Sequence, residues 1–290
     1  MITQKQNSKN PLHGLWALTN RELKKWYKEP IFLFMSIIQP VIWMGLFGKA
    51  MNIGSIFTGT SLPVPLPPGV DPQIVSQQIM KETFGTADYF SYMSVGILSF
   101  VVLFTAMFSG MSIVWDRRLG FLNKVLSTPV ARGSIIFAKV FSAVVRSLIQ
   151  AGIVLLVAFL LGLQLSPDFS VLNIFGVFAA LFLVCFGLSS IFILIAIRST
   201  RWETQMAVVN LLNLPLLFGS NALFPTKLMP DWLQAFARIN PITYVTDATR
   251  QLILFETNVM QLMFDFAFLA GFALVFSTVG LVLSWRYLSK

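Results

Sequence analysis

The stretch "VLNIFGVFAALFLVCFGLSSIFILIAI", residues 171–197, decides the fold of this chain. It contains no charged residue, and about 20 apolar residues in helical form are enough to cross a hydrocarbon core of ~30 Å. A backbone in hydrocarbon must satisfy its own hydrogen bonds, and a helix does so along its whole length. The stretch therefore predicts a transmembrane helix.

The rest of the chain repeats this composition. Of its 290 residues, 56% are hydrophobic and only 11% are charged, whereas soluble domains are about one quarter charged. We therefore predict an all-α polytopic membrane protein, with residues 1–29 as a cytoplasmic tail and interfacial helix and residues 30–290 as one transmembrane domain. Its six predicted spans are 31–49, 89–115, 135–165, 171–197, 204–226 and 266–285.

The net charge of +9 is arranged along the chain in a way that indicates topology and excludes nucleic-acid binding. Basic residues gather in the tail and in alternate loops, which is the positive-inside pattern of multi-pass proteins of the cell membrane. Both termini are therefore predicted to be cytoplasmic. The basic residues placed inside are Lys5, Lys9, Arg21, Lys24, Lys25, Lys28, Arg117, Arg118, Lys124, Arg132, Lys139, Arg198, Arg201, Arg286 and Lys290.

The segment before the first span is predicted to be an amphipathic helix on the cytoplasmic membrane surface. Lys24 and Lys25 next to Trp26 suit the headgroup region. Thr19 and Glu22 have the spacing of a capping box, in which each side chain accepts from a backbone donor. Pro30 is expected to open the first span, and Pro40 to kink it.

Two outer segments are predicted. The first is a long loop at 50–88, which is proline-rich and carries a short helix near 73–83. The second is a helical hairpin at 227–265, formed by "MPDWLQAFARINP" and "ITYVTDATRQLILF". Both hairpin helices are too short to span, so we expect them to dip into the outer leaflet as a re-entrant hairpin, which is tolerated where protein or water covers the backbone.

A loop at 116–134 lies between two apolar spans, within the stretch "WDRRLGFLNKVLSTPVARGSII" from Trp115 to Ile136. On one helix Leu119, Leu122 and Leu126 would share a face, and Pro129 would end that helix. One interpretation is a helix resting on lipid headgroups. The other is a docking helix that inserts into a groove on a cytoplasmic partner.

This loop also resembles that of ABC-2 type export permeases, in its run of acid, basic pair, glycine, amphipathic turn and "TPVARGSIIFAK". A second stretch, "FPTKLMPDWLQAFARINPITYVTDATRQLI", is similar to the outer helical hairpin before the last span of the same family. The most similar group is the daunorubicin-resistance type of multidrug efflux permease. The resemblance runs from Arg21 through the sixth predicted span.

The resemblance implies a permease subunit that moves a drug or lipid-like substrate outward. It also implies a second permease chain, as a homodimer or heterodimer, and two copies of an ABC ATPase subunit that carry ATP and Mg. The chain would then be no enzyme and hold no cofactor, metal or catalytic residue, and it lacks a complete phosphate loop. The residues expected to dock the ATPase are Asp116, Arg117, Arg118, Gly120, Leu122, Leu126, Pro129 and Arg132.

The fifth predicted span carries a polar arc of Asn210, Asn213, Ser220 and Asn221. It could line the translocation pathway, or it could form hydrogen bonds between helices. Two alternative functions are an export permease for polysaccharide or lipid-linked glycan, and an ion-coupled secondary transporter. The second is disfavoured because the predicted spans, apart from the one with Arg146, have no acid or base in their central stretch.

Overall fold

The computed structural model describes residues 11–50, 72–86, 88–128, 130–199 and 201–288, and within these ranges the regular structure is entirely helical. Lys5, Lys9, Pro129, Lys290 and the proline-rich part of the outer loop at 51–71 lie outside the described residues. The helical fold class predicted from the sequence is confirmed for the part of the chain that is described.

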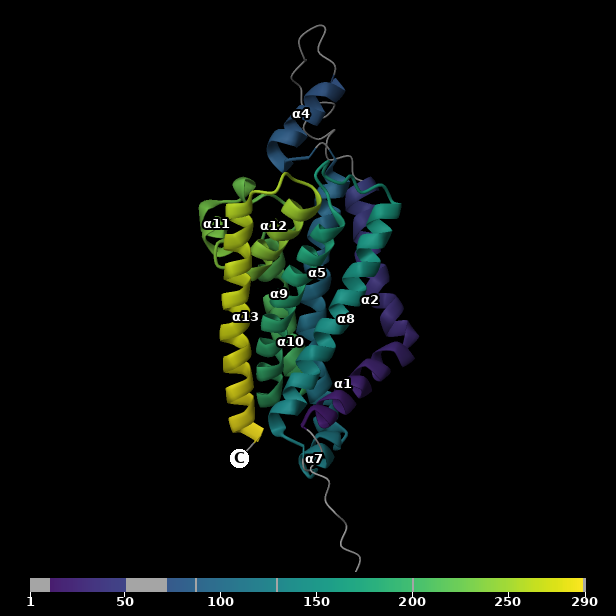
Figure 1. Cartoon of the computed structure of the whole chain (residues 1–290), viewed down its shortest axis with the longest axis vertical. Coiled ribbons are helices and arrows are strands. Elements are labelled where there is room, and N and C mark those ends of the chain that lie inside the picture. Colours follow the sequence, from purple (N-terminus) through teal and green to yellow (C-terminus); the bar gives the residue numbers. More distant parts are fainter. Residues whose placement is uncertain (1–10, 51–71, 87, 129, 200, 289–290) are drawn as a thin grey trace, which may run out of the picture.

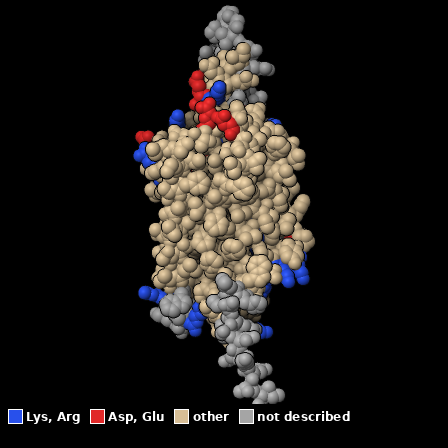
Figure 2. Space-filling view, viewed as in Figure 1, with Lys and Arg blue, Asp and Glu red and all other residues tan. Residues whose placement is uncertain are grey.

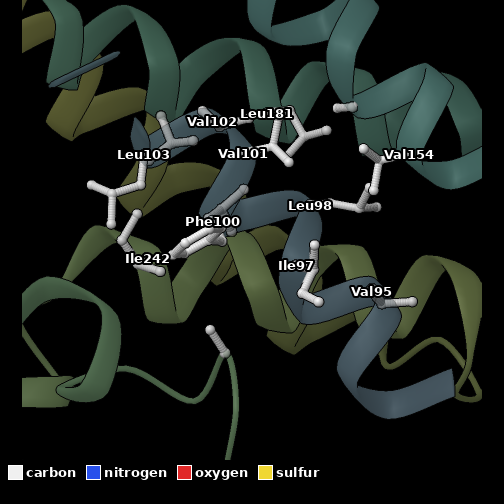
Figure 3. Packing of buried hydrophobic residues seen from close by; sticks show 14 of the residues in the cluster. Val95, Ile97, Leu98, Phe100, Val101, Val102, Leu103, Val154, Leu181 and Ile242 are labelled. Carbon is white, nitrogen blue, oxygen red and sulfur yellow. The ribbon is translucent and has the colours of Figure 1, made fainter. Parts of the chain in front are cut away.

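The long helices form a bundle around α5, as Figure 1 shows. Helix α5 packs against α8, α9 and α12, and α9 also packs along α13. Buried aliphatic and aromatic side chains fill the space between them, including Leu98 and Phe100 of α5, Leu181 of α9 and Ile242 of α12 (Figure 3). The bundle segments are α2 (Pro30–Trp43), the π-helix η1 (Met44–Ala50), α5 (Tyr89–Ser109), α6 (Met111–Arg118), α8 (Arg132–Leu160), α9 (Val171–Arg198), α10 (Trp202–Phe218) and α13 (Val259–Leu288).

Four described helical segments are long and apolar enough to cross a membrane, namely Gln77–Arg118, Arg132–Leu160, Val171–Arg198 and Val259–Ser284. The helical segments Gly14–Lys28 and Leu33–Lys49 meet at an angle of 66°, and the two together would make a fifth span if they cross the membrane as one bent segment. The chain is therefore a multi-pass membrane protein, and the number of six spans stays a prediction.

Helix α10 is shorter than the predicted span 204–226, with 17 residues ending at Phe218. Pro215 lies inside its last turn and has no N–H to donate, which weakens the helix there. The Gly219 N–H closes the final turn on the Pro215 carbonyl at 2.8 Å. The residues that follow form a turn.

The two ends of the bundle differ (Figure 1). One end holds α1 (Pro11–Lys28), α7 (Phe121–Leu126) and the end of α13. The other holds α4 (Pro72–Phe84), α11 (Asp231–Ala237) and α12 (Pro241–Ile253), with the short 3-10 turn η2 (Thr226–Leu228) before α11. On the face in Figure 2 the charged side chains gather at these two ends, which is the distribution expected around a hydrocarbon layer.

The short helices predicted in the outer segments are confirmed as helices α4, α11 and α12. Helix α12 begins where the Asn240 side chain accepts from the Ile242 N–H at 3.0 Å, followed by Pro241 at the first helical position. These are two of the ordinary start signals of a helix. Helix α12 packs against α5, α9 and α13, so it lies within the bundle.

The predicted capping box in the N-terminal helix is wrong. Helix α1 is continuous through Thr19, whose hydroxyl donates to the Leu15 carbonyl one turn earlier at 2.9 Å. Glu22 is 4% exposed and pairs with Lys139 of α8 at 3.2 Å. The local spacing fits a cap, but burial against α8 gives both side chains other partners.

Candidate functional site

A group of charges joins α1, α6 and α8, and we call it the charge cluster: Glu22, Asp116 and Lys139, which are buried, Arg21, which is half-buried, and Lys25, which is exposed. The Asp116 carboxylate accepts from Lys139 at 2.6 Å, from Lys25 at 2.9 Å and from Arg21 at 3.0 Å. Glu22 accepts from Arg21 at 2.8 Å and from Lys139 at 3.2 Å. Each of the three cations therefore reaches a carboxylate.

The burial of this cluster makes its pairing important for stability. Asp116 is 1% exposed and Lys139 is 4% exposed. A buried charge left without its partner destabilises a protein strongly, by about 3–5 kcal/mol. Two carboxylates face three cations, so the cluster also carries a net positive charge.

The loop at 116–134, which we call the coupling loop after the role predicted for it, is broken into two helices by Gly120, contrary to the prediction of one helix. Helix α6 ends at Arg118, and Gly120 adopts a left-handed conformation with φ of 71° before α7 begins. A glycine adopts this conformation without the steric cost that other residues meet. The turn separates the leucines predicted to share one face: Leu119 is 74% exposed, whereas Leu122 is 4% exposed.

Helix α7 is attached to α1 and α8 through its buried face. Leu122 and Val125 pack with Ile135 of α8, and Leu18 of α1 lies against the same cluster. The Arg21 guanidinium lies 3.3 Å from the centre of the Phe121 ring, a cation–π contact. Leu122 is therefore not on the surface, where a groove anchor would have to be.

The other predicted docking residues are spread between the interior and the surface. Arg117 is half-buried and donates to the Ile197 and Ser199 carbonyls at the end of α9, at 2.6 Å and 2.9 Å. Leu126 and Arg132 are half-buried, whereas Arg118 and Gly120 are exposed. The outward side of the loop, which we call the exposed ridge, consists of Arg118, Leu119, Gly120, Asn123, Lys124 and Ser127.

The polar arc predicted on the fifth span does not exist as one helical face. Asn210 is exposed on α10, and Asn213 is half-buried there with a buried Oδ1 that has no hydrogen-bond partner among the described residues. Ser220 and Asn221 lie beyond the helix, in the buried turn. A 3.6-residue period cannot relate residues on opposite sides of a helix end.

Asn221 instead takes part in a second polar site, built around Arg250, that sequence reasoning missed. Arg250 is 1% exposed, and its guanidinium donates to the carbonyls of Asn221 and Ala222 at 2.7 Å each and of Tyr92 at 3.2 Å. The guanidinium also lies 3.4 Å from the centre of the Tyr92 ring. The Asn221 amide donates to Asp247.

Electrostatics at this site follow from burial. Burial lowers the pKa of the Arg250 guanidinium, and the neighbouring Tyr92, Asp247 and Tyr89 oppose that shift. Burial also raises the pKa of the Asp247 carboxyl, against the effects of the Arg250 charge and the Asn221 amide. A charged residue on the otherwise buried face of α12 is the sequence signal that could have pointed to this site.

Gly96 of α5 allows the turn after α10 to approach this closely. A Cβ at this position would lie 1.9 Å from the Ala222 carbonyl oxygen and 2.8 Å from Arg250 Nη2. No side chain fits that space. Arg250 of α12 thus hydrogen-bonds to the turn and to α5, and Gly96 leaves the space in which the turn approaches α5.

Asp265 is a further buried acid that the sequence analysis passed over, because the last span was predicted to begin at Phe266. Helix α13 begins at Val259. Asp265 is 0% exposed and accepts from the Gln251 and Gln261 amides at 3.1 Å and 3.0 Å. Within the described residues, no group of three or more His, Cys, Asp or Glu side chains is placed to hold a metal ion.

Comparison with known proteins identifies relatives of this chain. Residues 13–254 match the family model for the ABC-2 type transporter. A putative transport permease ycf38 of Cyanophora paradoxa is 32% identical over 289 residues, covering 96% of this chain and 90% of the relative. The permease of the same name from Porphyra purpurea is 30% identical, covering 86% of this chain and 76% of the relative.

A more distant relative carries a more specific name. The daunorubicin resistance ABC transporter permease protein DrrB1 of Streptomyces coeruleorubidus is 23% identical over 168 residues. The match covers 58% of this chain and 59% of that protein. The matched family and the three relatives are all described as transporters or transport permeases.

Proposed function

Because the chain belongs to the ABC-2 type transporter family, we propose that it is the membrane-spanning permease subunit of an ABC exporter. A separate ATPase subunit, present in two copies, would bind ATP and Mg and drive transport from the cytoplasmic side. The substrate would be hydrophobic or amphiphilic, a drug or a lipid-like molecule, moved outward. The drug class is suggested by the relative named for daunorubicin resistance.

The observation that carries this proposal is the attachment of the coupling loop to the bundle. The charge cluster and the buried face of α7 tie residues 116–126 to α1 and α8. A force applied to this loop from the cytoplasm would therefore move these helices instead of bending the loop. A subunit driven by an external ATPase needs such a connection.

The exposed ridge is the part of the loop that we propose contacts the ATPase. Leu119 is the apolar anchor, since it is 74% exposed, and Arg118 and Lys124 flank it. Asp116 and Leu122 would not touch the ATPase, and instead fix the position of the exposed ridge through their buried contacts with α1 and α8. This assignment revises the sequence-based hypothesis, in which Leu122 itself entered the groove.

We further propose six spans, with α2 and η1 as the first and α10 as the fifth, and with both termini in the cytoplasm of a cell-membrane protein. The basic residues near α1, α7 and the end of α13 support this orientation. Two such chains would pair, as a homodimer or a heterodimer, with the substrate path between them. Export of a polysaccharide or glycan lipid is the alternative within the family.

Co-purification and transport test the proposal together. The chain is co-expressed with a candidate ABC ATPase subunit, and Leu119→Asp is compared with Leu228→Asp, an exposed leucine at the opposite end of the bundle. We expect Leu119→Asp to lose the ATPase and ATP-dependent efflux, and Leu228→Asp to keep both. Transport by the purified chain alone in an ion gradient would overturn the proposal and favour ion coupling, for which Asp265 would be the candidate residue.

A further inference from the structure

Helix α1 has three distinct faces, which follow from the rotation of about 100° per residue along an α-helix. The first face, with Leu15, Leu18, Thr19 and Glu22, is turned toward the protein, where α1 packs along α8. It is fully or half buried. The other two faces point away from α8, although Arg21 and Lys25 at the edge of the third face reach Asp116 of α6.

The second face is aromatic and exposed. Trp16 is 62% exposed and Tyr27 is 53% exposed, and both lie on one side of the helix because they are eleven residues, about three turns, apart. Tryptophan and tyrosine are enriched at the boundary between hydrocarbon and headgroups. In a chain that spans the membrane, this row indicates the depth at which α1 lies.

The third face is basic and hollowed, and we call it the basic groove. An open groove of about 330 Å³ runs along α1 and is lined by Ala17, Asn20, Arg21, Lys24, Lys25 and Lys28. The groove is shallow and open to its surroundings, since all of its lining residues belong to the single helix α1. The groove lies directly beside the aromatic row on the helix surface.

The charges of the basic groove are only partly neutralised. Arg21 and Lys25 are held by Asp116 at 3.0 Å and 2.9 Å, on the side of the groove nearest α6. Lys24 and Lys28 are exposed, and among the described residues neither forms an ion pair, with the neighbouring Glu29 or with any other acid. The groove therefore offers two uncommitted ammonium groups one helical turn apart, with the Asn20 amide beside them.

We propose that the basic groove of α1 binds the phosphate headgroup of an anionic phospholipid. Lys24 and Lys28 would supply the positive charges, Asn20 a neutral hydrogen-bond donor, and Trp16 and Tyr27 would lie at the level of the glycerol and upper acyl chains. Basic residues beside an exposed aromatic row match the two regions of one lipid, the charged headgroup and the apolar body. A soluble polyanion would use the lysines but not the aromatic row.

The test uses the full-length protein purified in a neutral detergent and its thermal unfolding followed by tryptophan fluorescence. Short-chain phosphatidylglycerol, short-chain phosphatidylcholine and inorganic phosphate are titrated separately. We expect phosphatidylglycerol alone to raise the unfolding temperature in a saturable manner. In the double variant Lys24→Gln/Lys28→Gln the apparent affinity should fall by about thirtyfold, because each lysine contributes about fivefold near an anionic lipid surface.

The matched control is Lys81→Gln/Lys227→Gln, which removes two exposed lysines at the opposite end of the bundle and should leave the affinity unchanged. Equal loss in both double variants would mean a general charge effect and would overturn the site. An equal response to phosphatidylcholine would also overturn it, and saturation by inorganic phosphate alone would identify a free anion instead of a lipid. The proposal does not depend on an ATPase partner, so its failure is distinguishable from failure of the proposed function.

Discussion

Lys139 of α8 and Asp116 of α6 form an ion pair with a distance of 2.6 Å between Nζ and Oδ2, and both side chains are almost completely buried. They are 23 residues apart in sequence, on either side of the coupling loop. The pair therefore closes that loop at its base. Arg21 and Lys25 of α1 bind the same carboxylate and add the N-terminal helix to the closure.

Asp116→Asn is expected to destabilise the protein by about 3 kcal/mol, because it leaves the buried Lys139 ammonium without its nearer carboxylate. Lys139→Met should cost less, since Arg21 and Lys25 still neutralise Asp116. Urea unfolding in detergent, followed by tryptophan fluorescence, measures the free energy of unfolding of both variants. If Lys139→Met proved the more damaging change, Asp116 would not be the centre of the cluster.

Leu122→Ala is expected to lower the free energy of unfolding by about 2–4 kcal/mol, because Leu122 is packed against α1 and α8. Leu119→Ala in the same loop is the matched control and should stay within about 0.5 kcal/mol of the wild type, since that side chain is exposed. The same unfolding assay separates them. Equal effects would contradict the division of the loop at Gly120.

Gly96→Ala is expected to disrupt the contact between α5 and the turn at Ala222, where the new Cβ would lie 1.9 Å from a backbone oxygen. A cost of about 2 kcal/mol or more is expected from such overpacking. Gly271→Ala in α13 is the control, because nothing lies within 4 Å of its Cβ position. That variant should be neutral or stabilised by about 0.5–1 kcal/mol through the better helix propensity of alanine.

Arg250→Lys is expected to destabilise the end of the bundle that holds α11 and α12 by about 2–3 kcal/mol, although charge is conserved. A lysine ammonium cannot reproduce the planar set of donors that reaches three carbonyls at once. The effect should appear as faster hydrogen exchange in α12 and in the turn at 219–223. Arg238 is an exposed arginine of the same hairpin. The control variant Arg238→Lys should change neither the stability nor the hydrogen exchange of these segments.

Stability should depend on the protonation of Asp247. Burial raises its folded-state pKa above the unfolded value, so the folded protein binds this proton more tightly, and stability falls as pH rises through the folded-state pKa. Asp247→Asn removes this dependence. The unfolding temperatures of the wild type and of Asp247→Asn, compared from acidic to neutral pH, isolate the contribution of Asp247. Parallel curves for the two proteins would show that Asp247 titrates as in the unfolded chain.

Much of the fold could be predicted because it rests on local patterns. The charge-free run at 171–197 became α9, and the short amphipathic stretch "ITYVTDATRQLILF" became most of α12, since hydrophobic length and helical periodicity act within a segment. The site was less predictable. The sequence placed Leu119 and Leu122 on one helical face, but the turn at Gly120 separates them, so that Leu119 is exposed and Leu122 is buried.

The sequence by itself determined that the chain is a helical membrane protein of the ABC-2 family, and where most of its long apolar helices lie. Hydrophobic length and backbone hydrogen bonding decide these features within each segment. Only the tertiary structure decided that Asp116 meets Arg21 and Lys139, that Arg250 meets Asn221, and that α10 ends before Ser220. Such contacts join residues far apart in the chain, and burial selects among partners that local spacing treats as equivalent.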